Sequence, residues 1–549
     1  MARRRDSAVQ IDLSPDAPGV EGVGADGADV DGAGPGERPA ADEPGWFTRH
    51  VGGPLARRWR ATSPRRRAAF VALTAVAVVG TAGGVAVLDA RADAAHAARM
   101  AQMPGGVADL SQPVAETWRV ETDGGIRAVL PDGVVVTQDG TDVLALDTAT
   151  GDEVWRRDVG PSPQCGPQPL LPADYARPVD QVVCFHGRGD RSVTVIDAAG
   201  TVLGTRALGD EGGGVDAAND IAGRGVAPMA DGAVADIDQV DRTLEAAAPA
   251  EALEELDRRR ADGTWQDPVL RVRDALTGEV RGEATLRVRT AEELEGCRVP
   301  GDDGASSVWL GASVWASPSL VQGAICGTSA VLTADGTPTE AVVPATGGGY
   351  LAFDDGGTRL VDVHGEGDVV LPGYVLQPFA IDDTDGPRLV LDVDEGRLAA
   401  YDDTGERRWG TDVDRVGIDN VLVRAGGTAV VQRADEIVGL DLESGEPRWT
   451  RTDVGQVTPA AGYGGIAGTA ATDGSVALVP YYGDEGGILI VALDLTDGHV
   501  VWGPRSVGED LTEVQAVAGH LVGTARSGTQ RGDVLDETQE NTALIGLAG

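Results

Sequence analysis

The stretch that decides the fold is 145–155, Ala145-Leu-Asp-Thr-Ala-Thr-Gly-Asp-Glu-Val-Trp155. Its apolar residues alternate up to Asp147, and this alternation predicts a β-strand. Asp147 can accept hydrogen bonds from nearby backbone amides, and Gly151 can adopt the positive φ of a chain reversal, so a tight turn is expected. The chain then returns and places Trp155 on a face that must be covered by other residues.

The same unit recurs along the chain, and the recurrence predicts the architecture. Three further copies repeat the order Asp, Gly, Trp: Asp402, Gly405 and Trp409; Asp441, Gly445 and Trp449; and Asp494, Gly498 and Trp502. Weaker copies lie at 195–203 and 272–281. One such hairpin cannot bury its own apolar face, whereas stacked repeats can. The sequence therefore predicts a ring of small stacked sheets.

Two incomplete repeats lie at the two ends of this region. Residues 118–121 read as a last strand with no hairpin before it, and residues 542–547 read as a strand with no return. An N-terminal strand that completes a C-terminal sheet closes a ring and hides the sheet edges. We therefore predict an all-β fold over 115–549, a β-propeller of about eight four-stranded antiparallel blades. The range is seven to nine, because 347–373 fits either an extra degenerate blade or part of the fourth.

The residues before 115 predict a membrane anchor. Residues 1–64 are polar, rich in Gly, Pro and Asp, and end in a basic stretch, so we expect a disordered tail. Residues 68–88 are apolar and uncharged and would span about 31 Å as a transmembrane helix. Arginines precede this helix, which places the tail in the cytoplasm and the C-terminal domain outside, in a single-pass plasma-membrane protein. Residues 89–114 are expected to be a linker.

A cleaved signal peptide is the alternative to the anchor. Ala95-His96-Ala97 offers small residues of the kind found at cleavage sites. The segment before the apolar run is far longer than that of an ordinary signal peptide, so we favour a retained anchor.

The propeller pattern is interrupted at about 238–263. Leucines, charged residues and Pro249 in this segment indicate a helical insertion. The four cysteines, Cys165, Cys184, Cys297 and Cys326, form an even set in a domain outside the cytoplasm, which favours disulfides over a zinc site without any CxxC motif. Of the three pairings we predict Cys165–Cys184 and Cys297–Cys326, because each pair would lie inside one repeat on neighbouring strands.

Composition excludes several functions. The formal net charge of -42 argues against a nucleic-acid partner, which would be repelled. All basic residues are arginines, so no lysine is present for a Schiff base, a Walker A loop or a Ser-Lys pair. The histidines are scattered, GxSxG is absent, and the acidic segments 382–386 and 392–396 lack the downstream glutamate of a calcium loop. We therefore predict no catalytic, cofactor-binding or metal-binding residues.

The pattern A-x-D-x-x-T-G-x-x-x-W resembles the repeat of pyrroloquinoline quinone (PQQ)-type β-propellers, from about Trp118 to the C-terminus. The resemblance implies a ring of four-stranded blades with the repeat tryptophans packed between neighbours. Quinoprotein dehydrogenases of this family clamp PQQ under a disulfide between adjacent cysteines and bind calcium beside a catalytic aspartate. This sequence has no Cys-Cys pair. It has three asparagines, Asn219, Asn420 and Asn541, which leaves little for the usual calcium ligand set of those enzymes. It looks closer to the family's non-enzymatic members, such as the protein-binding lipoprotein of the outer-membrane barrel-assembly machine.

These observations predict a membrane-anchored, extracytoplasmic propeller that binds a protein or a cell-envelope polymer and is not an enzyme. Its acidity favours a basic or cation-bridged partner. The alternative is a PQQ-dependent dehydrogenase with a divergent cofactor site. A transmembrane sensor is a third hypothesis, although the tail shows no recognisable effector domain.

Overall fold

The computed structural model describes residues 91–549 except 188–191, 209–225, 238–241, 245–247, 296, 301–305, 355–356, 368, 393–395, 413–417, 434–435, 453, 455–468, 483–487, 509–510 and 528–540. The predicted tail (1–64) and the predicted membrane span (68–88) lie outside the described residues. Within those residues, no helix is both long and apolar enough to cross a membrane.

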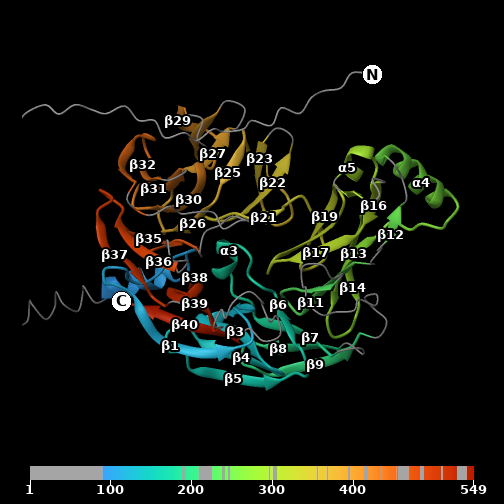
Figure 1. Cartoon of the computed structure of the whole chain (residues 1–549), viewed down its shortest axis with the longest axis horizontal. Coiled ribbons are helices and arrows are strands. Elements are labelled where there is room, and N and C mark those ends of the chain that lie inside the picture. The colour runs from blue at the N-terminus through green and yellow to red at the C-terminus, as the bar shows by residue number, and fades with distance from the viewer. Residues whose placement is uncertain are drawn as a thin grey trace, which may run out of the picture. The chain divides into compact units, whose positions relative to one another are not determined.

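Nine four-stranded antiparallel sheets follow one another along the chain and form the blades of a propeller (Figure 1). Blades 1 to 3 are β2 (Ala128–Leu130), β3 (Val134–Asp139), β4 (Asp142–Asp147) and β5 (Glu153–Asp158); β6 (Gln164–Gly166), β7 (Gln181–His186), β8 (Ser192–Asp197) and β9 (Val202–Ala207); and β10 (Val226–Pro228), β11 (Ala233–Ile237), β13 (Val269–Asp274) and β14 (Val280–Thr285).

Blades 4 to 6 are β17 (Ala312–Ala316), β18 (Leu320–Ile325), β19 (Thr328–Thr333) and β20 (Pro338–Thr339); β21 (Val343–Pro344), β22 (Tyr350–Asp354), β23 (Gly357–Val361) and β24 (Val369–Leu371); and β25 (Tyr374–Leu376), β27 (Arg388–Asp392), β28 (Arg397–Tyr401) and β29 (Arg407–Asp412). Blades 7 and 8 are β30 (Ile418–Ala425), β31 (Thr428–Arg433), β32 (Glu436–Asp441) and β33 (Pro447–Arg451); and β34 (Ala471–Thr472), β35 (Val476–Tyr482), β36 (Ile488–Asp494) and β37 (Val500–Ser506). The short strand β26 (Pro378–Ile381) joins blade 7 by parallel pairing with β30.

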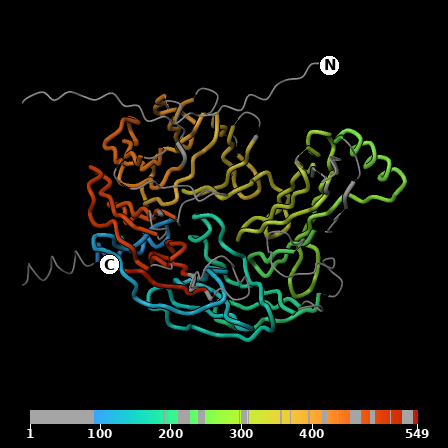
Figure 2. The backbone as a smooth tube through the Cα atoms, in the orientation of Figure 1, coloured from blue at the N-terminus to red at the C-terminus, as the bar shows by residue number. Residues whose placement is uncertain are grey.

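The ninth blade is built from both ends of the described chain. It contains β38 (Leu511–Val517), β39 (His520–Ser527), β40 (Asn541–Ala548) and β1 (Ala115–Thr122). β1 pairs antiparallel with β40 from Ala115 opposite Ala548 to Thr122 opposite Thr542. Figure 2 shows the blue start of the tube beside its red end. The predicted closure by an N-terminal strand is confirmed.

The blade number lies at the upper end of the predicted range and is not the eight expected. The additional blade is blade 5, which covers most of the segment that was ambiguous in the sequence. Its outer turn keeps Asp362 and Gly365 but has no tryptophan after them, so the strongest mark of the repeat is missing there.

The core is a series of apolar clusters, one at each junction between consecutive blades. The junction that closes the ring joins Val135 and Leu144 of blade 1 to Val522 and Leu544 of blade 9. Each blade buries its two faces against two neighbours, and this arrangement stabilises sheets that are too small to be stable alone.

An inserted subdomain packs beside blades 3 and 4. It is built from two chain segments, one between β11 and β13 of blade 3 and one between blades 3 and 4. It consists of α4 (Pro249–Ala261), α5 (Ala291–Glu295) and a three-stranded sheet of β12 (Arg242–Leu244), β15 (Arg298–Pro300) and β16 (Ser306–Leu310). Leu256 and Leu294 of its helices share a buried cluster with blades 3 and 4. The insertion therefore takes up residues 291–310 as well as the helical segment read from the sequence.

Both predicted disulfides are present. Cys165 and Cys184 lie directly opposite one another on β6 and β7, with Cα atoms 4.0 Å apart. Cys297 is bonded to Cys326, but the expected placement of this pair inside one repeat was wrong. Cys297 belongs to the inserted subdomain and Cys326 to the β18–β19 turn of blade 4, because the insertion separates the two cysteines into different sheets.

Candidate functional site

The repeat tryptophans join neighbouring blades. In four cases the indole Nε1–H donates to the carbonyl oxygen of the residue after the turn aspartate of the next blade: Trp118 to Thr148 (3.1 Å), Trp155 to Ala198 (3.1 Å), Trp409 to Leu442 (2.8 Å) and Trp449 to Leu495 (3.1 Å). The turn glycine lets the ring come close, since a Cβ at Gly498 would lie 2.4 Å from the Trp449 ring. These residues therefore hold the blades together and do not gather into a site.

Trp502 has a different partner. In blade 9 the third and fourth strands, β40 and β1, come from distant parts of the chain, so no repeat turn joins them. The Trp502 Nε1–H donates to the carbonyl oxygen of Leu110 at 2.7 Å. Asp109 precedes Leu110 and accepts a hydrogen bond from the Ser111 amide at 2.8 Å, as the repeat aspartates do from their own turns. The segment before β1 thus supplies the missing turn.

Because the strands of each blade alternate in direction, the turn after the first strand and the turn after the third strand lie on the same face. We call this face, which carries the repeat aspartates, the turn face. Residues 91–100 are helical and dock on it. His96 Nε2 is hydrogen-bonded to the main-chain carbonyl oxygen of Asp473 (2.7 Å), Arg99 pairs with the Asp383 carboxylate (2.5 Å), and Met100 is fully buried. Much of the expected linker is therefore bound to the propeller.

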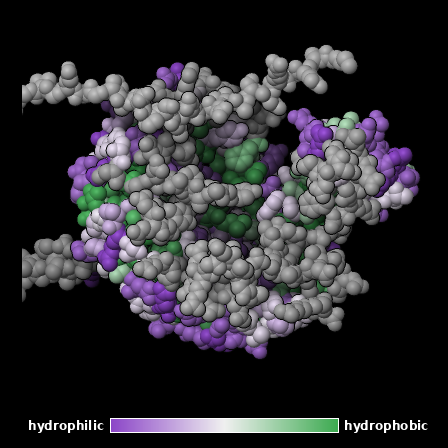
Figure 3. All heavy atoms as spheres, viewed as in Figure 1, coloured by the Kyte–Doolittle hydropathy of each residue, from purple (hydrophilic) through white to green (hydrophobic). Residues whose placement is uncertain are grey.

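The centre of the propeller holds two connections. α3 (Pro172–Tyr175) lies between β6 and β7, and β26 lies between β25 and β27; both are near the middle of the view in Figure 1. Arg177, just after α3, donates to the Tyr350 hydroxyl at 3.0 Å and lies 5.0 Å from the centroid of that ring. Blade 2 thus contacts blade 5. Figure 3 shows hydrophobic residues in the hollow near the middle of the view, and mostly hydrophilic residues where the outer edge is coloured.

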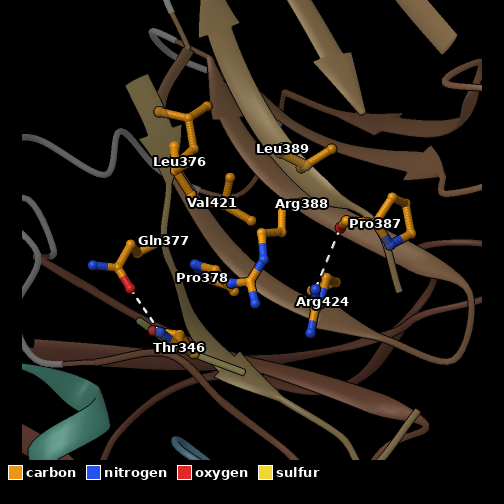
Figure 4. A pocket seen from close by; sticks show the side chains of 10 residues that line it. Thr346, Leu376, Gln377, Pro378, Pro387, Arg388, Leu389, Val421 and Arg424 are labelled. Carbon is orange, nitrogen blue, oxygen red and sulfur yellow. Dashed lines mark hydrogen bonds between the residues drawn. The ribbon is translucent and has the colours of Figure 1, made fainter. Parts of the chain in front are cut away.

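A first cavity lies between blades 6 and 7 and is very small, about 10 Å³. Arg388 and Arg424 line it. Arg424 Nη1 donates to the carbonyl oxygen of Pro387 at 3.3 Å (Figure 4) and to that of Gly386 at 2.9 Å. Burial lowers the pKa of Arg424, and Gln377 accepts a hydrogen bond from the Thr346 amide at 2.7 Å. The space suffices for about one water molecule.

A second cavity of about 420 Å³ lies on the turn face between blades 1 and 9, beside residues 98–102. Its polar lining includes Asp132 and Asp147 from turns of blade 1, Tyr175 at the end of α3, and His520 at the start of β39. Burial raises the pKa of Tyr175 and lowers that of His520, although the charge of Asp147 opposes the latter shift. The volume lies in the range of about 300–1,000 Å³ that is typical of small-molecule sites.

Neither cavity fits PQQ, which carries three carboxylates. The first cavity offers arginines but no room, and the second offers room but is lined by two carboxylates and no arginine. The four cysteines form two bonds between distant positions, so the clamp of adjacent cysteines does not arise. Neither of these two cavities therefore matches the chemistry of this cofactor.

Candidate metal ligands are few among the described residues. Asp494, Asp497 and His499 come together on the outer turn of blade 8, where His499 Nδ1 and Asp497 are 2.6 Å apart. The Asp382 carboxylate accepts from Thr384 and from the Gly426 amide, so it closes a turn. Residues 393–395 of the second acidic segment lie outside the described residues.

The sequence did not predict the second cavity. Its lining comes from five segments, near residues 98–102, 129–133, 147–149, 175–178 and 518–520. No spacing in the sequence relates these segments, because their proximity depends on the closure of the ring and on the docking of residues 91–100.

Comparison with known proteins agrees with the repeat geometry. Residues 376–535 match the family model described as outer membrane protein assembly factor BamB. No curated protein matches the chain significantly. Similar solved structures include BamB from Moraxella catarrhalis, with TM-score 0.32, 11% identity and coverage of 79% of this chain and 100% of that one.

Two further structures have comparable similarity. The computationally designed protein Ika8 has TM-score 0.31 and 13% identity, with 79% of this chain and 99% of that chain covered. The quinohemoprotein alcohol dehydrogenase ADHIIG from Pseudomonas putida HK5 has TM-score 0.30 and 14% identity, with 79% and 76% covered. Residues 376–535 match the BamB family model, and Asp-Gly-Trp contacts of the same kind recur outside the matched segment, so the repeat of this chain is similar to that of PQQ-like β-propellers.

Proposed function

We propose that this protein is a non-catalytic binding or scaffold module for a protein or a cell-envelope polymer. The observation that carries the proposal is the mismatch between the cavities and the family's cofactor: one cavity has cations without space, and the other has space lined by carboxylates. The family model matched by residues 376–535 is described by the name of an assembly factor, which supports a role in protein binding.

We further propose that the propeller is anchored to the plasma membrane by residues 68–88 and lies outside the cytoplasm. The uncharged apolar run, the arginines before it and the two disulfides support this arrangement. Membrane fractionation of the full chain checks it. The full chain should remain in the membrane pellet after a high-salt wash, and a variant lacking 68–88 should be released.

The binding function is tested by crosslinking the full chain in its native membrane and identifying what is captured. A captured protein or envelope polymer should be the same in repeated experiments and should be lost when residues 115–549 are removed. Capture that does not depend on the propeller would contradict the proposal.

The alternative, a PQQ-dependent dehydrogenase, is tested separately. PQQ and calcium are added to the purified chain, and both quinone binding and reduction of an artificial electron acceptor are measured. We expect neither saturable binding nor turnover with alcohol substrates. Saturable quinone binding accompanied by dye reduction would replace the proposed function with the enzymatic one.

A further inference from the structure

The turn aspartates of the repeat differ in how their second carboxylate oxygen is neutralised. In three blades an arginine near the start of the return strand pairs with this Oδ2 atom: Arg281 with Asp274 (2.8 Å) in blade 3, Arg408 with Asp402 (2.8 Å) in blade 6, and Arg448 with Asp441 (2.6 Å) in blade 7. In blades 6 and 7 this arginine immediately precedes the repeat tryptophan. The repeat thus provides a recurrent place for a guanidinium group.

Blade 1 lacks this arginine. The residue before Trp155 is Val154, whose side chain is exposed. The Oδ1 atom of Asp147 accepts hydrogen bonds from the amides of Ala149 and Thr150, each at 2.9 Å, as in the other turns. Across the described part of the chain, no arginine pairs with the Asp147 carboxylate. Its charge is therefore not balanced in the way seen in blades 3, 6 and 7.

In blade 1, the place that the Arg281 guanidinium occupies in blade 3 falls in the second cavity. In blade 3, Arg281 also donates to the main-chain oxygen of Asp231 at 3.1 Å, in the turn between the first two strands. Asp132 is the counterpart of Asp231 in blade 1: both have positive φ, 61° and 56°, and both precede a glycine. Asp132 and Asp147 both line the second cavity. Blade 1 thus has the acceptors but an open space between them.

The other groups of the lining suit a cationic donor. Tyr175 is partly buried, and desolvation raises its pKa, so its hydroxyl brings no charge to the lining. His520 has a pKa lowered by burial, so its imidazole is neutral at pH 7 and does not replace the arginine. The volume of about 420 Å³ admits a long side chain.

We propose that the second cavity binds an arginine side chain of a protein partner, with Asp147 as its counter-ion. Arginine fits better than lysine because its planar group can donate to a carboxylate and a carbonyl oxygen together, as Arg281 does. The net charge of -42 also attracts a basic segment to this chain. The inference rests on the proposed function and specifies the chemistry of the partner.

The direct test uses two short peptides, acetyl-Gly-Gly-Arg-Gly-Gly-amide and the same peptide with uncharged citrulline in place of arginine. Their binding to the full chain is measured by titration calorimetry or by protein-observed NMR. We expect saturable binding of the arginine peptide and at least tenfold weaker binding of the citrulline peptide. Equal binding of the two peptides, or no saturation by the arginine peptide at millimolar concentration, overturns the inference.

Two variants locate the binding. Val154→Arg supplies the guanidinium that blades 6 and 7 carry at this place, so it should reduce arginine-peptide binding at least tenfold while keeping the melting temperature unchanged or higher. Asp147→Asn keeps the Oδ1 acceptor of the turn and should weaken binding to a similar extent. The matched control is Asp494→Asn, which changes the same turn position in blade 8 and should leave binding unchanged. Binding that survives Val154→Arg overturns the proposed location.

Partner capture separates this inference from the proposed function. If the native chain and Val154→Arg capture the same partner equally well, the binding function stands and the arginine site is wrong. If neither captures a partner that depends on the propeller, the proposed function fails, whatever the peptides show.

Discussion

At the scale of single residues, pairing with an arginine lowers the pKa of a turn aspartate and so makes stability depend on pH. Asp441 accepts from Arg448 and from the Ser444 amide, and these bonds lower its pKa to about 2. A carboxylate whose pKa is lower in the folded state than its usual value of about 3.9 stabilises the fold above about pH 4. This stabilisation is lost as the pH falls from about 4 to 2.

Replacing Arg448 with methionine should therefore reduce stability at pH 7 more than at pH 2. We expect a loss of up to about 1 kcal/mol at pH 7, because the pair is partly exposed and screened by solvent. Urea unfolding at the two pH values measures it. In an Asp441→Asn background the pH-dependent part of the Arg448→Met effect should vanish; if it persists, the pairing is not its cause.

The close approach of turn glycine to tryptophan makes a second prediction at this scale. Gly498 has φ +71°, and an added Cβ would meet the Trp449 ring at 2.4 Å. Gly140 has a similar φ of +62° but no atom within 4 Å of such a Cβ. Gly140→Ala should cost about 1 kcal/mol from backbone strain alone. Gly498→Ala should cost about 1–3 kcal/mol more, since the ring must also move.

Chemical denaturation of the two variants gives the comparison, and tryptophan fluorescence reports any displacement of the ring. Equal losses of stability would show that the ring moves at no cost and would contradict the role assigned to this contact.

At the scale of elements, the inserted subdomain is held in two ways. Its helices share a buried cluster with blades 3 and 4, and the Cys297–Cys326 bond ties it to a blade 4 turn. The other disulfide, Cys165–Cys184, joins paired strands inside blade 2. Similar bonds thus perform different tasks: one attaches an insertion, and the other reinforces a sheet.

Replacing Cys297 and Cys326 with alanine should loosen the insertion and leave the ring intact. A chain-entropy estimate for a 29-residue separation gives about 3.6 kcal/mol. Hydrogen exchange should become faster in α4 and α5 while blades 6 to 9 remain protected. The matched control is removal of Cys165–Cys184, for which faster exchange should appear in blade 2 instead. Global acceleration in the first variant would show that the insertion is integral to the ring.

At the scale of the whole molecule, the ring depends on a junction between residues far apart in the chain. Leu544 is fully buried in the cluster that joins blades 9 and 1, whereas Leu256 is buried where α4 of the insertion packs on blades 3 and 4. Leu544→Ala and Leu256→Ala remove the same atoms, and each should cost about 2–5 kcal/mol. The two variants should differ in which strands and helices lose stability.

Hydrogen exchange should show Leu544→Ala loosening β1 and β2–β5 together with β38–β40, which lie at opposite ends of the chain. Leu256→Ala should act on the insertion and on blades 3 and 4. If exchange in β1–β5 does not respond to Leu544→Ala, closure contributes little to stability and the ring is held mainly by neighbouring repeats.

The sequence by itself determined the turns, the stacked blades, the closing strand and the two cysteine pairings. These features depend on local chemistry: an aspartate caps its own turn, a glycine permits the reversal, and a tryptophan four residues later marks the seam. The separate identity of blade 5, the extent of the insertion, the docking of residues 91–100 and the cavity beside Asp147 were decided by the tertiary structure. Each requires contacts between segments far apart in the chain, where no periodic signal relates one residue to its neighbour in space.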